Sequence, residues 1–144
     1  MIQEKGFVAF GQAIKNFWRG YVDFKGRSTR SGYWFAALFN FLVSLVIILA
    51  LAATIWYESV GLMLFFLFAL IIYGLAIALP SLAITTRRIT DTGLPFSIAL
   101  VLALLPLIVS LVFSGVSNFV VFIINSVVNL AIFILALLPT NTFK

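Results

Sequence analysis

Hydrophobic residues in this chain form long runs that short polar segments interrupt. The first run covers about residues 33–56 and the second about 62–84. A longer apolar stretch follows, and polar turn residues at 115–118 divide it into runs at about 96–114 and 119–138. A helix that crosses a lipid bilayer needs about 20 mostly apolar residues. The pattern therefore predicts four transmembrane helices with these limits.

Residues 1–32 have a different pattern, in which apolar positions recur at steps of three and four. The positions that share this spacing are Phe7, Phe10, Ile14, Phe17 and Tyr21. Such spacing puts side chains on one face of a helix. We predict a short amphipathic helix here, lying in the cytoplasmic interface with its apolar face toward the lipid. Packing of the same face against the cytoplasmic end of the transmembrane helices is an equally good interpretation.

The distribution of positive charge predicts which side of the membrane each end of the chain occupies. All nine Lys and Arg residues lie in the N-terminal segment, in the loop at 85–95 or in the short tail at 139–144. The turns at 57–61 and 115–118 contain none. Positively charged loops stay in the cytoplasm, so we expect both termini there, which requires an even number of spans. The predicted fold is an all-α integral membrane protein, a four-span helical bundle over residues 33–138 preceded by the amphipathic helix.

Composition narrows the possible chemistry. Hydrophobic residues make up 64% of the chain and charged residues 9%, which is far from the mixture of a soluble domain. The chain has no cysteine and no histidine, and only four carboxylates. Disulfides and nucleophile–histidine pairs are therefore excluded, and metal ligands are scarce. We expect no enzymatic activity, no cofactor and no metal site. The basic segment adjoins a span, so it favours anionic lipid headgroups over nucleic acid.

Polar residues inside the predicted spans are few and uncharged. No Asp, Glu, Lys or Arg lies in the middle of a span, which argues against an ion-coupled transporter. Asn40 lies in the first span, and Asn125 and Asn129 share a face of the fourth. Amides form hydrogen bonds across helix contacts in membranes, so we predict a packing role for all three. The alternative is that Asn125 and Asn129 face a cavity or the helix of a partner.

The remaining candidate residues gather at the predicted cytoplasmic interface. They are Arg27, Arg30, Tyr33, Trp34, Arg87, Arg88 and Asp91. Arginine suits lipid phosphate or a partner's carboxylate because its planar fork donates two hydrogen bonds at once. Asp91 is expected to pair either locally with Arg87 or Arg88, or across to Arg27 or Arg30. The plain interpretation treats the arginines as topology determinants and the two aromatic residues as interfacial anchors.

Two motifs resemble those of a known family. The stretch Phe24–Phe35, which reads F-K-G-R-S-T-R-S-G-Y-W-F and is followed by Asn40, is similar to the opening signature of the bacterial membrane family called domain of unknown function 805. Pro80, with R-R-I-T-D-T at 87–92, is similar to its second signature, although Thr90 stands where that family usually has His. The resemblance implies a multi-pass protein of the bacterial cytoplasmic membrane and implies no reaction.

Three hypotheses for function follow from these observations. The first is a small accessory or interaction protein that binds a larger membrane protein or a second copy of itself. The second is a protein that binds anionic lipid headgroups through a cytoplasmic arginine rim. The third is a small-solute channel or carrier formed by an oligomer.

Overall fold

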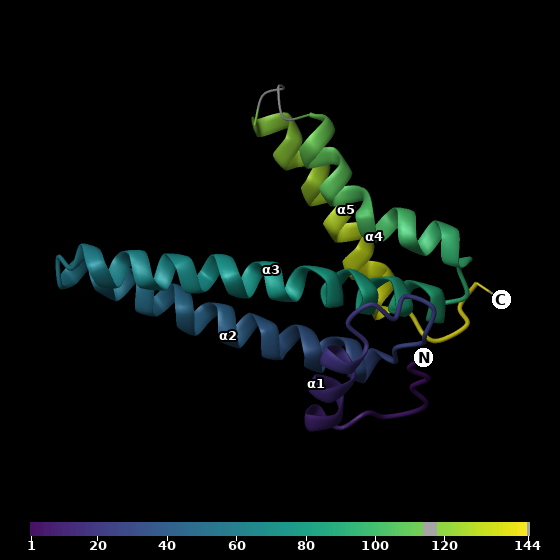
Figure 1. The fold of residues 1–144 in the computed structure, drawn as a ribbon. Coiled ribbons are helices and arrows are strands. Elements are labelled where there is room, and N and C mark those ends of the chain that lie inside the picture. The colour runs from purple at the N-terminus through teal and green to yellow at the C-terminus, as the bar shows by residue number, and fades with distance from the viewer. Residues whose placement is uncertain (114–117, 144) are drawn as a thin grey trace.

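The computed structural model describes residues 1–113 and 118–143, and its regular structure is helical apart from one isolated bridge between extended segments. The helices are α1 (Phe10–Arg19), α2 (Arg30–Trp56), α3 (Val60–Asp91), α4 (Phe96–Val112) and α5 (Asn118–Leu137) (Figure 1). The bridge joins Gln3 to Arg27. The end of the predicted third span at residue 114, the turn that follows it and Lys144 lie outside the described residues.

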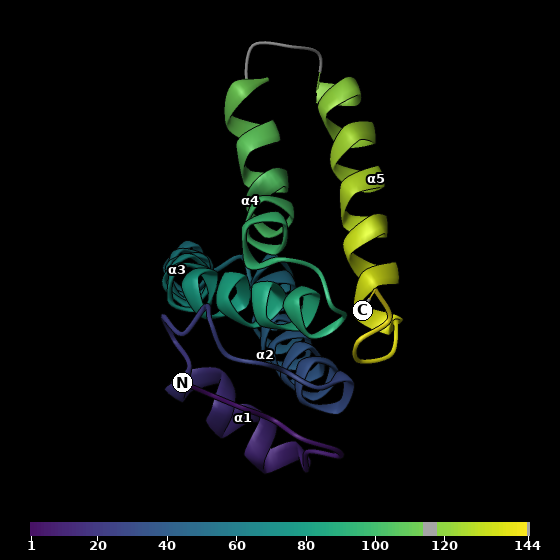
Figure 2. The same ribbon diagram turned by 90° about the vertical axis from the view of Figure 1, so that its right-hand side faces the viewer.

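The four long helices form two hairpins, α2 with α3 and α4 with α5. The hairpins meet near the two chain termini and diverge away from them (Figure 1). Seen from the side, α4 and α5 stand next to each other and rise away from α2 and α3 (Figure 2). The sequence predicts a four-span helical bundle, and in the structure its four helices pair into two hairpins that meet at one end. Apolar faces have no hydrophobic drive to associate in lipid, so only specific contacts hold helices together there.

Specific contacts between the hairpins occur where they meet. The ring of Trp34 on α2 packs edge-on against Phe133 of α5, with 5.2 Å between ring centroids. Ile132 and Ala136, on the same helix, are buried. Because no comparable contact joins the outer parts of the described hairpins, the two arms stay apart.

The second helix of the first hairpin, α3, continues further than its hydrophobic run. The sequence predicts a span that ends near residue 84 and a loop at 85–95, whereas α3 continues to Asp91. The hydroxyl groups of Thr86 and Thr90 donate to the carbonyl oxygens four residues earlier, each at 2.9 Å, so these polar residues fit the helix. Gly93, with φ of 107°, lets the chain turn directly into the next helix.

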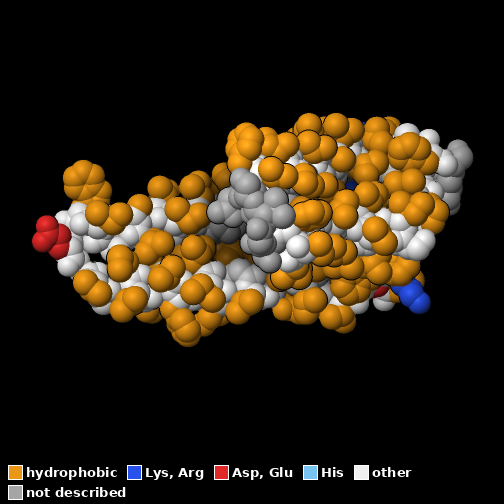
Figure 3. Space-filling view, turned by 90° about the horizontal axis from the view of Figure 1, so that it is seen from above, with side chains coloured by type: hydrophobic (Ala, Val, Ile, Leu, Met, Phe, Trp, Pro, Cys, Tyr) orange, Lys and Arg blue, Asp and Glu red, His pale blue; other side chains and the backbone are white. Residues whose placement is uncertain are grey.

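Three of the helices, α2, α3 and α5, are long and apolar enough to cross a membrane. The fourth apolar helix, α4, has 17 residues and bends midway, where Pro106 lacks the N–H that a straight helix requires (Figure 1). Hydrophobic side chains cover most of the face seen in Figure 3, and charged side chains gather at its ends. The chain is an all-helical, multi-pass membrane protein.

The amphipathic helix α1 packs against α2 and α3. Phe17 is buried in a small core with Ala36 and Ile84. Phe10 begins the helix and is 42% exposed, whereas Phe7 precedes the helix and is 79% exposed. The described structure thus places the inner part of the predicted apolar face on the bundle and leaves its outer part on the surface.

Candidate functional site

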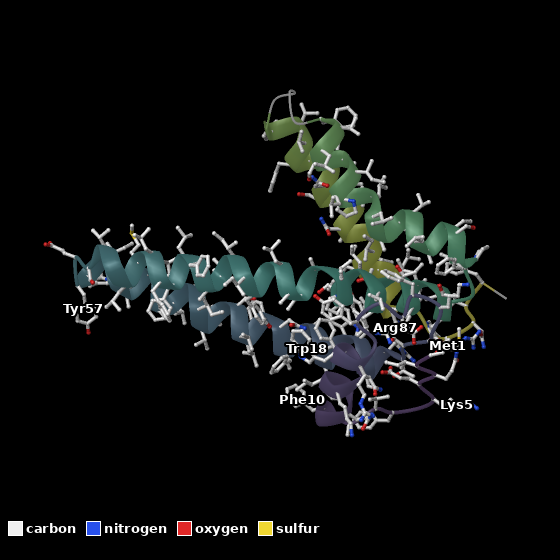
Figure 4. All side chains as sticks on the ribbon, viewed as in Figure 1. Met1, Lys5, Phe10, Trp18, Tyr57 and Arg87 are labelled. Carbon is white, nitrogen blue, oxygen red and sulfur yellow. The ribbon has the colours of Figure 1, made fainter. Side chains whose placement is uncertain are left out.

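Polar side chains are concentrated at the end of the molecule where the hairpins meet and where both termini lie (Figure 4). We call this region the polar junction. It is defined by the buried polar residues Glu4, Ser28, Thr29, Thr86, Arg87, Arg88, Asp91 and Thr92. These residues come from the N-terminal segment, the start of α2, the end of α3 and the turn after it. Segments that are far apart in the sequence are therefore joined by polar contacts.

Arg88 connects the two hairpins. One terminal nitrogen donates to the carboxylate of Asp91 at 2.7 Å, and both side chains are buried. The Nε atom donates to the carbonyl oxygen of Ala136 at 3.2 Å, and the second terminal nitrogen donates to that of Leu138. The last carbonyl groups of a helix have no partners within the helix. A side chain of α3 therefore satisfies the end of α5.

Asp91 completes this connection by holding the C-terminal tail. Its carboxylate accepts a hydrogen bond from the hydroxyl of Thr140 at 2.8 Å. Its backbone carbonyl accepts from the N–H of Asn141 at 2.9 Å. Of the two pairings that the sequence leaves open, the structure has the local one, because the salt bridge of Asp91 is with Arg88.

Glu4 occupies the N-terminal end of α2. Its carboxylate accepts from the backbone N–H of Thr29 at 2.9 Å and from the amide of Asn16 at 2.8 Å. A Cβ atom at Gly32 would overlap this carboxylate, so the glycine leaves room for it. A negative charge is favourable at a helix N-terminus. The sequence pattern gave no signal for Glu4, because its partners lie 12 or more residues away.

Arg87 lies near Met1, at the end of α3 against the N-terminal segment (Figure 4). Its side chain is fully buried, and a Cβ atom at Gly20 would overlap its guanidinium group. The carboxylates of Asp23 and Glu4 are the opposite charges that act on it. Its three nitrogens have no hydrogen-bond partner among the described residues. An arginine in this position contributes charge balance inside the junction and is not available to lipid.

The predicted rim of four exposed arginines is therefore not formed. Arg87 and Arg88 are both buried, whereas Arg27 is half-buried and Arg30 is exposed. The misprediction has a physical cause, since arginines beside an apolar run are usually interfacial, and burial here depends on contacts with distant segments.

A polar groove of about 440 Å³ opens beside the junction. Lys5, Arg27 and Thr29 contribute to its lining, together with Glu4 and Asp91. The two carboxylates already have hydrogen-bond partners, and the two cations have no carboxylate within 4.0 Å in the described part of the chain. The two carboxylates balance the two cations, so the lining has no net charge. It offers no nucleophile–base pair, and no group of three metal-ligating side chains was found in residues 1–113 and 118–143.

The two aromatic candidates face neighbouring helices. Tyr33 is partly buried against the core that contains Phe17. Trp34 is half-buried, and its ring contacts Phe133 of α5. The sequence predicts interfacial anchors at both positions, whereas here they are contacts between helices.

Two of the three candidate amide residues in the spans each join two neighbouring helices. Asn40 accepts a hydrogen bond from the hydroxyl of Tyr73 at 2.8 Å, which links α2 to α3. Asn125 donates to the hydroxyl of Ser110 at 3.0 Å, which links α5 to α4. Tyr73 was not a candidate from the sequence, because a tyrosine near a membrane span is usually expected at the interface.

Asn129 differs from the other two amides because its side chain is exposed. It donates to the backbone carbonyl of Asn125 at 2.9 Å, within its own helix. It precedes Phe133 and Ala136 by four and seven residues, so it shares their helical face. That face packs on α2 and α3 near the junction. Asn129 lies one turn further from the junction than Phe133, along the part of α5 where the hairpins diverge (Figure 1).

Similarity to known proteins identifies the family of this chain. The family model described as "Protein of unknown function (DUF805)" matches residues 21–142. No curated protein and no solved structure matches the chain. The matched stretch contains α2 to α5 and both motifs of the polar junction, and it begins after α1 and Glu4. The chain therefore belongs to the family of proteins of unknown function DUF805.

Proposed function

We propose that this protein is an accessory membrane protein that receives a transmembrane helix of a larger membrane protein between its two hairpins. The observation that carries the proposal is the exposed amide of Asn129 on the inner face of α5. A polar group in the hydrocarbon layer is costly unless it is hydrogen-bonded, and amides there are commonly paired across helix contacts. The space between the hairpins is where such a partner fits.

The neighbouring amide, Asn125, already takes part in the contact with α4. The side-chain oxygen of Asn125 is buried and has no hydrogen-bond partner among the described residues. It precedes Asn129 by one helical turn, on the same side of α5. The exposed amide of Asn129 is therefore the group that a serine, threonine or amide side chain of a partner helix can reach, at about 0.6 kcal/mol for each hydrogen bond.

The proposal includes a topology of four spans with both termini in the cytoplasm of a bacterial cell. Its support is that the described Lys and Arg residues lie in the segments at the end of the molecule that carries both termini, whereas Glu58 lies in the turn between α2 and α3 at the opposite tip. With 17 residues, α4 is about 25 Å long, which is near the lower limit for a crossing helix.

Single cysteines test this topology cleanly, because the native chain has none. In intact cells, a membrane-impermeant maleimide is expected to label Glu58→Cys and Val116→Cys. Lys5→Cys is expected to react only after the cells are permeabilised. Labelling of Val116→Cys only after permeabilisation would mean that α4 and α5 do not cross the membrane.

A photo-crosslinking amino acid tests the partner site. Placed at residue 129, it is expected to form an adduct with a different membrane protein. The matched control is residue 127, whose native side chain is 62% exposed on nearly the opposite side of the same helix. Equal adducts at both positions, or an adduct at 129 with only a second copy of this chain, would overturn the proposal.

A further inference from the structure

We infer that a groove beside the start of α4 binds the headgroup and the upper acyl chain of an anionic phospholipid. The groove has a volume of about 610 Å³. Its lining includes Arg19, Val22, Lys25, Phe96 and Leu100. It is separate from the polar groove of the junction and from the space between the hairpins, so it does not depend on the proposed partner.

One half of the groove is positively charged. Arg19 ends α1 and Lys25 lies in the loop that follows, and both side chains are exposed. Neither has a carboxylate within 4.0 Å in the described structure. The one acidic residue in the lining, Asp23, already accepts a hydrogen bond from the backbone N–H of Ile2. Two cations are thus left for an anion, and a phosphodiester has the geometry that arginine binds well.

The start of α4 adds to this positive field. Phe96 is the first residue of the helix and lines the groove, and Pro95 before it provides no side-chain cap. The first N–H groups of a helix lack partners within the helix and carry partial positive charge. Oxygen atoms of a phosphate beside Arg19 and Lys25 would therefore also lie close to the positive end of the α4 helix dipole.

The other half of the groove is apolar. Val22 is 68% exposed and Phe96 is 36% exposed, and Leu100 continues the same wall one turn further along α4. An inorganic anion would leave these side chains uncovered, whereas an acyl chain would cover them and gain from burial of apolar surface. Charge and apolar wall together therefore select an amphipathic anion. The position fits, because α4 leads from the cytoplasmic end into the apolar region.

Native mass spectrometry of the full chain, titrated with phosphatidylglycerol or phosphatidylcholine in detergent, tests this assignment. The wild-type chain is expected to retain one phosphatidylglycerol in preference to phosphatidylcholine. The variant Arg19→Gln/Lys25→Gln should lose affinity by roughly thirtyfold, since each cation near the headgroups contributes about fivefold. The matched control Lys5→Gln/Lys15→Gln removes the same charge from exposed positions outside the groove, and it should retain the lipid.

Two further measurements separate the lipid from a free anion. Leu100→Trp fills the apolar half and keeps both cations, so it is expected to remove phosphatidylglycerol while the melting temperature stays near that of the wild type. Inorganic phosphate at millimolar concentration is expected not to compete. Equal loss of lipid in the two charge variants, full binding by Leu100→Trp, or competition by phosphate would each overturn the assignment.

Discussion

Replacing Arg88 by methionine removes a side chain of α3 that bonds to the end of α5. Methionine has a similar length and fills the apolar part of the space, so the change isolates the guanidinium group. Four hydrogen bonds are lost: the one to the carboxylate of Asp91 and those to the carbonyl oxygens of Ser28, Ala136 and Leu138. The carboxylate of Asp91 remains, buried and without its cation.

The size of the effect follows from burial. The side chains of Arg88 and Asp91 are 0% and 3% exposed, so water cannot replace the lost partner. Removal of one member of a buried ion pair costs about 3–5 kcal/mol, mainly because the other charge is left uncompensated. The double variant Arg88→Met/Asp91→Asn leaves neither charge of this ion pair unpaired. It should lose clearly less stability than the single variant. Thr140 keeps a hydrogen-bond partner at residue 91 in both variants, so this bond does not account for the difference.

Equilibrium unfolding in mixed micelles, with the SDS fraction as the denaturant, measures these differences in free energy of unfolding. Arg30→Met is the matched control, because Arg30 is exposed and has no salt bridge in the described chain. It should behave like the wild type. If Arg88→Met lost no more stability than this control, or if the double variant lost as much as the single variant, the buried connection between the hairpins would be refuted.

Three further substitutions probe the rest of the polar junction and the core. Gly32→Ala should force the carboxylate of Glu4 away and expose the N-terminal segment to protease, whereas Gly74→Ala, which meets open space, should not; equal cleavage would contradict the cap on α2. Tyr73→Phe should cost about 0.6 kcal/mol in the same unfolding assay, and no loss would mean that its hydroxyl does not link α2 to α3. Phe17→Ala should cost about 3–5 kcal/mol because the ring is 1% exposed, and a loss below 1 kcal/mol, the scale of an ordinary substitution, would place α1 away from the core.

Hydrophobic runs alone predicted where the long helices lie. The first predicted span and α2 both end at residue 56, and the third predicted span and α4 both begin at residue 96. The end of α3 was missed because the helix outlasts its apolar run. Continuation to Asp91 depends on the contacts of Arg88 with α5, and a local pattern carries no information about them.

The sequence identified several residues of the candidate site but not how they are arranged. Sequence placed Arg87 and Arg88 at the membrane surface, because charge beside a span normally stays in water or among headgroups. Their burial requires Glu4 and Asp23 near the other end of the chain, whose charges act on Arg87. It also requires the end of α5, where Ala136 lies 48 residues after Arg88. The divergence of the hairpins was equally hidden, since the sequence indicates which faces are apolar and not which of them meet.

Native mass spectrometry of the protein, extracted gently from its own membrane, tests the proposed function most directly. We expect one different membrane protein bound in a fixed ratio. We also expect that Asn129→Trp, which fills the inner face of α5, abolishes this complex, while Val127→Trp on the outer face leaves it intact. A lone chain, a complex of identical chains only, or equal loss of the partner in both variants would contradict it.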